Sequence, residues 1–161
     1  MKLPLGVCAV LIVAAAAADQ LVKSTVETVM PLGEMRPLLP FLALLRAHNE
    51  GVAFSFLEGT GPLLLIVMTL VISVGAIIYL VRTPVDALTA RFGLALILGG
   101  ALGNLIDRVR LGYVIDYIFF HTPMWSFAIF NLADVFISVG AALVFFDEIF
   151  LKSRRQAPAE N

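Results

Sequence analysis

The sequence predicts a membrane protein built mainly from helices, with a small β element. Its composition is the first reason: 60% of the 161 residues are hydrophobic and 14% are charged, whereas soluble domains average roughly 45–50% and 25%. The second is that four segments are apolar over about the 20 residues that a helix needs to cross a bilayer. The third is a long segment with prolines and glycines between the first two apolar segments. Together they predict a bundle of four transmembrane helices with a β element outside it.

The four apolar segments cover residues 3–21, 62–81, 92–108 and 130–151. The first resembles a cleavable secretory signal, but a polar motif follows it at once and further apolar segments come later, so we expect it to be retained. The second is the clearest, because Thr60 can cap a helix there and proline suits its first turn. We expect the chain, residues 1–161, to form a single domain.

Two longer segments join these spans on one side of the membrane. Residues 24–61 contain three prolines, and within them 25–30 and 51–56 resemble short strands, which predicts a small sheet at the membrane surface. Residues 109–129 are rich in aromatic side chains, a composition typical of the membrane interface. Basic residues are denser in the short segments on the other side, which places both termini in the cytoplasm.

Polar side chains gather at the outer ends of the predicted spans. Ionisable groups inside a membrane are costly, so they are candidates for function. Asp134 is followed by twelve residues of which only Ser138 is polar, so a solvated surface position does not explain it. Asp19 and Lys23 are four residues apart in the favourable acid-first order, which indicates a structural ion pair. The other members of the set are Asn104, Asp107, Arg108, Asp116 and Asn131.

Two carboxylates at one membrane level indicate acid–base chemistry. Carboxylates that lie close together share one proton near neutral pH, and such a pair can activate water and protonate a peptide group. A metal site is disfavoured because no histidine or cysteine accompanies the acids, so we expect no metal and no cofactor. The net charge of −1 does not support a nucleic-acid partner.

Two other function classes stay open on these observations alone. Acids in membrane spans also serve proton-coupled carriers, although carriers place their sites at mid-depth. A non-enzymatic assembly factor could use the outer segments as a docking surface. Such a factor would tolerate the loss of Asp134, whereas a peptidase would not.

Five short motifs, in this order, make the chain resemble the lipoprotein signal peptidase (signal peptidase II) family. They are DQLVK at 19–23, NEGVAFS at 49–55, GGALGNLIDR at 99–108, GYVIDY at 112–117 and FNLAD at 130–134. Val52, Ile115 and Tyr117 depart from the residues common in the family. None of these departures removes a functional group.

The resemblance implies an intramembrane aspartic endopeptidase that cleaves diacylglyceryl-modified prolipoproteins before the lipidated cysteine. It implies four transmembrane helices, a periplasmic β-cradle from 24–61 and a short, mobile extracytoplasmic helix within 109–129. The enzyme would lie in the bacterial inner membrane among its lipids, as a monomer, with its active site near the outer face. The residues that the resemblance assigns are the catalytic pair Asp116 and Asp134, the substrate-site residues Asn49, Asn104, Arg108 and Asn131, and the structural supports Asp19, Lys23 and Asp107.

Overall fold

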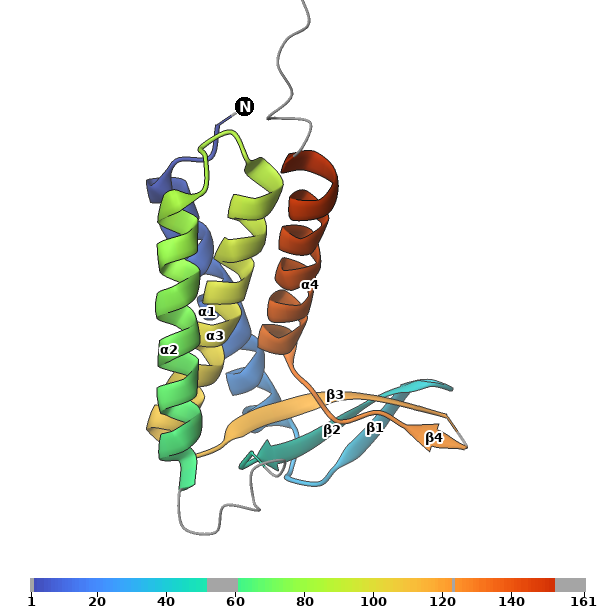
Figure 1. Cartoon of the computed structure of the whole chain (residues 1–161). Helices are drawn as coiled ribbons and strands as arrows, with labels where there is room; N and C mark the ends of the chain where they lie inside the picture. Colours follow the sequence, from blue (N-terminus) through green and yellow to red (C-terminus); the bar gives the residue numbers. More distant parts are fainter. Residues whose placement is uncertain (1, 52–60, 123, 153–161) are drawn as a thin grey trace, which may run out of the picture.

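The computed structural model describes residues 2–51, 61–122 and 124–152, and in these residues a bundle of helices stands on a small antiparallel sheet (Figure 1). The helices are α1 (Leu5–Val29), α2 (Gly61–Arg82), α3 (Leu88–Leu111) and α4 (Leu132–Phe146), and α4 continues into the π-helical turn η2 (Asp147–Leu151). The start of α1 and the end of η2 lie at the end of the bundle opposite the sheet (Figure 1).

The sheet has the strand order β1 (Met35–Leu39), β2 (Leu42–Asn49), β3 (Val114–Thr122) and β4 (Trp125–Ser126). Its central pair joins the two segments that the helices separate, because β2 precedes α2 and β3 follows α3. The antiparallel register sets Asn49 opposite Val114 and Ala47 opposite Asp116. The first residues of β3 are buried, and β1 is exposed along its length. The buried end of the sheet therefore lies against the helices.

Helix α3 is the centre of the bundle, where small residues allow close helix packing. A Cβ atom at Gly103 would lie 2.5 Å from Oδ2 of Asp19 on α1, and one at Gly93 would lie 2.6 Å from the carbonyl oxygen of Gly140 on α4. Both neighbours are held in place by other contacts, so glycine is what lets α1 and α4 approach α3 so closely.

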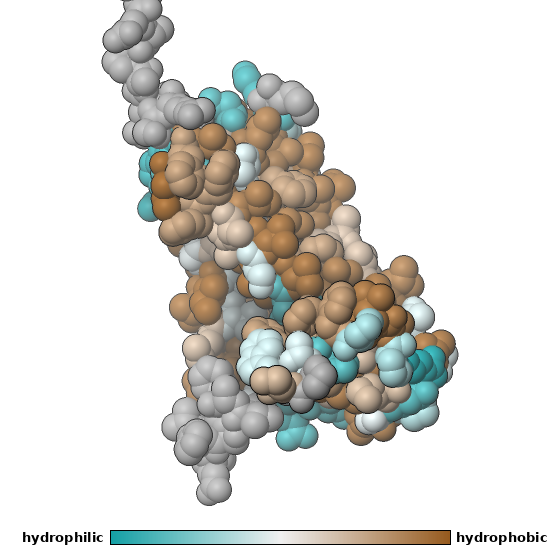
Figure 2. Space-filling model, turned by 90° about the vertical axis from the view of Figure 1, so that its right-hand side faces the viewer, coloured by the Kyte–Doolittle hydropathy of each residue, from teal (hydrophilic) through white to brown (hydrophobic). Residues whose placement is uncertain are grey.

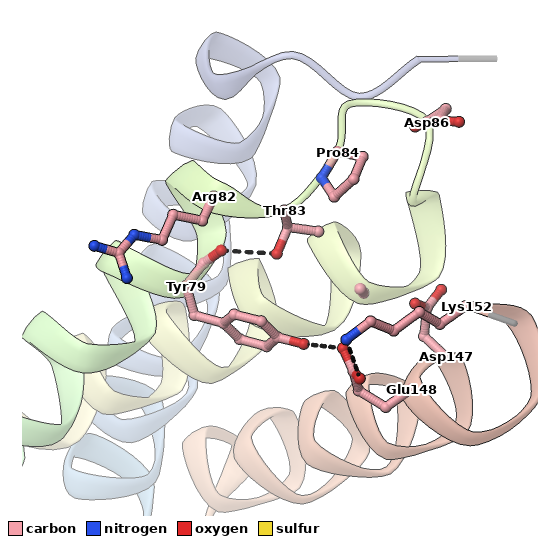
Figure 3. Close-up of a pocket in the computed structure, with 9 residues that line it drawn as sticks. Tyr79, Arg82, Thr83, Pro84, Asp86, Asp147, Glu148 and Lys152 are labelled. Atoms are coloured by element: carbon pink, nitrogen blue, oxygen red, sulfur yellow. Dashed lines mark hydrogen bonds and ion pairs between the residues drawn. The ribbon is translucent and has the colours of Figure 1, made fainter. Parts of the chain in front are cut away.

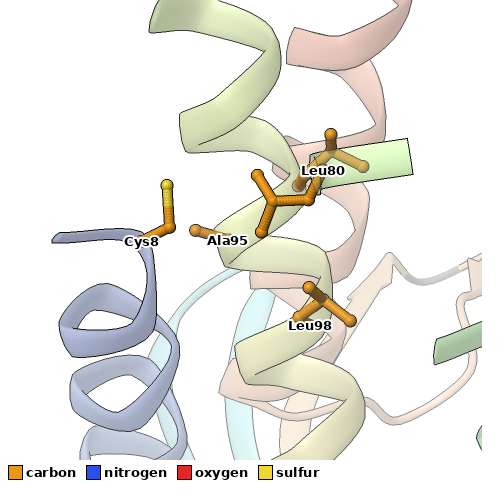
Figure 4. Packing of buried hydrophobic residues seen from close by; sticks show 5 residues of the cluster. Cys8, Leu80, Ala95 and Leu98 are labelled. Carbon is orange, nitrogen blue, oxygen red and sulfur yellow. The ribbon is translucent and has the colours of Figure 1, made fainter. Parts of the chain in front are cut away.

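The buried hydrophobic cluster of the bundle is small and lies between α1, α2 and α3. It consists of Cys8, Leu80, Leu94, Ala95 and Leu98 (Figure 4). Many other apolar side chains point outward: Val10 on α1, Val71 on α2 and Phe145 on α4 are each 67% exposed. Figure 2 shows hydrophobic residues over most of the helical part of one face. An apolar exterior of this kind suits contact with lipid rather than with water.

Among the described residues, three helices are long and apolar enough to cross a membrane: Leu5–Val29, Leu63–Arg82 and Leu88–Leu111. Each overlaps a predicted span. Helix α4 has 15 residues before η2 begins and falls short of that length by itself.

Arg91 fastens the end of the bundle that lies away from the sheet. Its guanidinium is buried and donates to the carbonyl oxygens of Leu3 (2.6 Å), Thr83 (2.6 Å) and Leu80 (3.2 Å). The last carbonyl groups of a helix have no partner within the helix. Arg91 therefore satisfies the end of α2 and ties the start of α1 to it.

The strand expected at 25–30 is wrong, because α1 continues to Val29. β-branched residues favoured a strand in this segment, but two of them are accommodated in the helix. Thr25 and Thr28 donate their hydroxyls to the carbonyl oxygens one turn earlier, at 2.8 and 2.7 Å. Val26 and Met30 are buried against Tyr117. Packing against the sheet thus outweighs local propensity. The second expected strand, 51–56, lies almost wholly outside the described residues.

The helix expected within 109–129 is also wrong for the described part of that segment. Helix α3 ends at Leu111, Gly112 follows in the left-handed conformation with φ of 85°, and the chain then enters β3. Val114, Ile115 and the aromatic residues that follow favour a strand, and β2 supplies the partner that the sequence alone did not reveal. The sheet expected from 24–61 therefore takes half of its strands from the other outer segment.

Candidate active site

Two carboxylates meet where the sheet contacts the helices. Asp116 lies on β3 and Asp134 lies in the first turn of α4. Asp116 is 2% exposed, whereas Asp134 is partly exposed. The strand and the helix thus bring together two acids that are 18 positions apart in the sequence.

Asp116 is held by two amide groups. Nδ2 of Asn49, at the end of β2, donates to its Oδ2 at 2.9 Å, and Nδ2 of Asn131 donates to its Oδ1 at 2.7 Å. Burial raises the pKa of Asp116 to about 6, while the hydrogen bonds from Asn49 and Asn131 oppose that rise and the charge of Asp134 adds to it. Asp116 therefore gives up its proton far less readily than an exposed aspartate.

Asp134 forms a reciprocal cap with Asn131 at the start of α4. The side-chain oxygen of Asn131 accepts from the backbone N–H of Asp134 at 3.0 Å, and Oδ2 of Asp134 accepts from the backbone N–H of Asn131 at 3.2 Å. This pairing satisfies two backbone donors at the helix start, where a negative group is favoured. The other oxygen, Oδ1, accepts from Nδ2 of Asn104 on α3 at 2.8 Å. Helix α3 and the N-cap of α4 thus hold one carboxylate between them.

Asn131 links the two carboxylates directly. It is fully buried, its amide donates to Asp116, and its backbone N–H donates to Asp134. The same amide also donates to Oδ1 of Asn104 at 3.2 Å. A change at either acid is therefore felt at the other through one shared residue.

A buried ion cluster supports this network from α1 and α3. Nζ of Lys23 contacts Oδ2 of Asp19 at 2.8 Å and Oδ2 of Asp107 at 2.7 Å, and all three side chains are at most 2% exposed. Oδ1 of Asp19 accepts from the backbone N–H of Ala133 at 2.9 Å, and Asp107 accepts from that of Ile115 at 3.3 Å. The cluster thus joins α1 and α3 to the backbone beside each candidate carboxylate.

Arg108 lies close to the acids with unused hydrogen-bonding capacity. Its charge is attracted to Asp134, Asp116 and Asp107. Its Nη1 reaches the carbonyl oxygen of Asn104 at 3.5 Å, and its buried Nε has no hydrogen-bond partner within the described part of the chain. A guanidinium has no acceptor and donates readily to carbonyl oxygens. Arg108 can therefore bind a group that enters beside the carboxylates.

An apolar groove of about 430 Å³ runs beside Asp134. Its walls come from the segment before α4 and from the first turns of α4, and they are almost entirely apolar. Asp134 and Ser138 are the polar residues in the lining; the others are Phe127, Ala128, Ile129, Phe130, Val135 and Val139. The groove offers a hydrophobic chain a place beside a carboxylate.

A second cavity, of about 330 Å³, lies at the other end of the bundle, between the α2–α3 connection and η2 (Figure 3). There Glu148 is bonded by the hydroxyl of Tyr79 and by Nζ of Lys152. This cavity has no contact with the carboxylates of the sheet end. In the part of the chain that the structure describes, no three histidine, cysteine or acidic side chains gather as a metal site.

The structure brings together all nine residues singled out in the sequence, and two further residues, Gln20 and Tyr117, support the helices and the strand around them. Gln20 donates to Oδ1 of Asp107 at 2.7 Å and to the carbonyl oxygen of Gly103 at 3.1 Å. The hydroxyl oxygen of Tyr117 accepts from the backbone N–H of Leu132 at 3.1 Å, and burial raises its pKa to about 12. Gln20 lies in the motif at 19–23 and Tyr117 in the motif at 112–117. Their place in these motifs was the sequence signal that could have identified them.

Comparison with known proteins gives one consistent answer. Residues 11–150 match the family described as Signal peptidase (SPase) II. A protein named lipoprotein signal peptidase from Mesorhizobium japonicum is 58% identical over 142 residues, which is 88% of this chain and 84% of the relative. Another of that name, from Brucella ovis, is 52% identical over 139 residues, or 86% of each chain.

Two solved structures of bacterial membrane enzymes share the fold. The first, at 1.9 Å resolution, has a TM-score of 0.83 and 28% identity, and the match covers 92% of this chain and 96% of the other. The second, at 2.3 Å, has a TM-score of 0.82 and 26% identity, with 99% and 97% covered. The arrangement of helices and sheet is therefore shared with membrane enzymes over nearly the whole length.

Proposed function

This chain belongs to the signal peptidase II family, whose members remove signal peptides from prolipoproteins, and we propose that it does so as an aspartic endopeptidase using Asp116 and Asp134. One observation carries the proposal: Asn131 joins the two carboxylates in one hydrogen-bonded network beside an apolar groove. Such a pair can hold a single shared proton.

The surroundings of the two acids suggest separate roles. Asp116 is the more buried, and its pKa of about 6 makes it the natural holder of the shared proton. Asp134 is partly exposed at a helix start, where negative charge is favoured. Asp134 then takes a proton from the attacking water as general base, and Asp116 protonates the carbonyl oxygen or the leaving amine.

The hydrogen bonds also divide the substrate-site residues into two groups. The side-chain amides of Asn49, Asn104 and Asn131 are already engaged with the carboxylates, so we assign these residues to holding the catalytic pair. Arg108 retains an unused donor and is the residue that would bind a substrate carbonyl and stabilise charge developing on it.

The substrate in this proposal is a prolipoprotein whose cysteine carries a diacylglyceryl group, with cleavage just before that cysteine. The apolar groove beside Asp134 suits such a hydrophobic segment or its lipid. The peptide bond would then reach the acids from the membrane rather than from water.

The proposal includes the topology in the membrane. Helix α4, extended by η2, is the fourth span. It lies beside the three helices that are long and apolar enough to cross a membrane by themselves. Both termini then lie in the cytoplasm and the sheet lies on the outer side of the inner membrane as the β-cradle. The whole chain, residues 1–161, acts as one domain and as a monomer among the membrane lipids, without a cofactor.

The proposal is tested by cleavage of a diacylglyceryl-modified lipobox peptide in detergent or bilayer. Wild type is compared with Asp116→Asn and Asp134→Asn, and an unlipidated peptide is the control. We expect wild type to cleave only the lipidated peptide and each variant to lose orders of magnitude in kcat. Near-normal cleavage by either variant, folded as judged by its elution as a single species, would remove that residue from the catalytic pair.

A further inference from the structure

Lys23 faces three acceptors and no solvent. Its ammonium contacts Oδ2 of Asp19 at 2.8 Å, Oδ2 of Asp107 at 2.7 Å and Oδ1 of Asn104 at 2.9 Å. An ammonium has three protons to donate and no acceptor. All its donors are therefore used, two on carboxylates and the third on a side-chain amide.

The contact with Asn104 dictates which way round that amide lies. The atom that faces Lys23 must be the oxygen, since an NH₂ group there would meet the ammonium donor to donor. The same oxygen accepts from the amide of Asn131 at 3.2 Å, so two donors require it. The NH₂ group is thereby turned toward Oδ1 of Asp134, to which it donates at 2.8 Å.

A flipped amide would be unfavourable at each of its contacts. Its oxygen would face the carboxylate of Asp134, and its NH₂ would face Lys23 and the NH₂ of Asn131. Asn131 cannot turn to compensate, because its own oxygen accepts the backbone N–H of Asp134. From α1, Lys23 thus enforces the orientation of Asn104 together with the amide of Asn131, although Lys23 has no direct hydrogen bond to either candidate catalytic acid.

We propose that Lys23 is a positioning residue for Asp134, acting by fixing the amide orientation of Asn104. This inference rests on the proposed function, in which Asp134 is catalytic. It goes beyond a supporting ion pair in α1, because a support would affect only how much protein folds. A positioning residue also affects the rate of each folded molecule.

A double-mutant cycle with Lys23→Met and Asn104→Ala tests the proposal on the purified full chain. Loss of one hydrogen bond to a charged group corresponds to a fall in kcat of roughly 10- to 100-fold. We expect this fall for each single variant, with KM changed less than about threefold because no substrate contact is removed. We expect the double variant to equal Asn104→Ala, since Lys23 has nothing left to orient. Multiplying losses in the double variant would overturn the proposal.

Gln20→Leu is the matched control. It removes hydrogen bonds to Asp107 and Gly103 from the same cluster but leaves every contact of Asn104 in place. We expect lower thermal stability and wild-type kcat per folded molecule. A fall in kcat equal to that of Lys23→Met would mean that any damage to the cluster slows the enzyme, and the orienting role would be rejected.

Lys23→Met leaves two buried carboxylates without a counter-ion, so a second variant covers a failure to fold. Lys23→Met combined with Asp107→Asn removes one positive and one negative charge, and the cluster keeps its net charge. It must show the same fall in kcat; wild-type turnover would refute the inference. Full cleavage by Asp134→Asn would instead refute the proposed function, so the two failures are distinguishable.

Discussion

Asn131 is the residue at which helix capping and carboxylate binding can be separated by mutation. Its side-chain oxygen caps α4 by accepting the N–H of Asp134, and its amide donates to Asp116 at 2.7 Å. A cap contributes about 1 kcal/mol, and a hydrogen bond to a charged group contributes about 1.5–3 kcal/mol. Asn131→Ala loses both interactions. Asn131→Ser retains an oxygen that can cap and loses only the amide.

We expect both variants to lose roughly 10- to 100-fold in kcat, which corresponds to the free energy of the hydrogen bond from the Asn131 amide to Asp116. We expect only Asn131→Ala to show the additional fall in melting temperature, because it alone lacks a cap. The assay is cleavage of the lipidated peptide together with thermal unfolding in the same detergent. If Asn131→Ser cleaves at the wild-type rate, the amide does not hold Asp116 in a catalytic geometry and the reasoning is refuted.

Three further predictions concern pH, packing and a buried cation. Burial raises the pKa of Asp116 from 3.8 to about 6, so between these pH values the folded protein holds a proton that the unfolded chain has released. The free energy of unfolding therefore falls as pH rises through this window. Melting temperatures from pH 4 to 7 should show this fall in wild type and a smaller one in Asp116→Asn. Gly103→Ala, whose Cβ would lie 2.5 Å from Asp19, should destabilise the folded protein by about 1–3 kcal/mol. Gly6→Ala is the control and should not destabilise it, because the space around Gly6 is open. Equal melting temperatures for the two variants would contradict the close packing at Gly103. Arg91→Met should lower the melting temperature strongly with unchanged kcat per folded molecule. The carbonyl oxygens of Leu3 and Thr83 lose their donor and that of Leu80 keeps only the 3.3 Å bond from the backbone N–H of Thr83, all far from the carboxylates.

The sequence allowed the helices to be predicted because a membrane span has a strong signal. A run of about 20 apolar residues is compatible with few structures other than a transmembrane helix. The central residues of all four predicted spans are helical. The ends of the helices were less predictable, because outside the bilayer the backbone can also form strands and turns. At 25–30 the β-branched residues indicated a strand, whereas α1 continues to Val29 and Val26 is buried against Tyr117.

The gathering of the acids was predictable for the same reason, because topology alone puts the ends of alternate spans on one side. The pairing of β2 with β3 was not. It brings Asn49 to Asp116 across 67 positions of sequence, and no local pattern in either strand specifies its partner. The family resemblance implied a helix within 109–129, where the structure has the strand that carries Asp116. Hydrogen-bond direction among the three asparagines also needed coordinates, because an amide can lie either way round.

The ion pair between Asp19 and Lys23 bears on how the protein is made. The two residues are one turn apart on α1, so their bond can form while that helix is alone in the bilayer, before α3 has been synthesised. A lone ammonium or carboxylate would oppose the entry of a nascent helix into lipid, whereas a neutral pair within one turn presents far less charge. When α3 is inserted, Asp107 can pair with Lys23, whose ammonium is already held by Asp19. The order of synthesis thus matches the order in which these charges acquire partners.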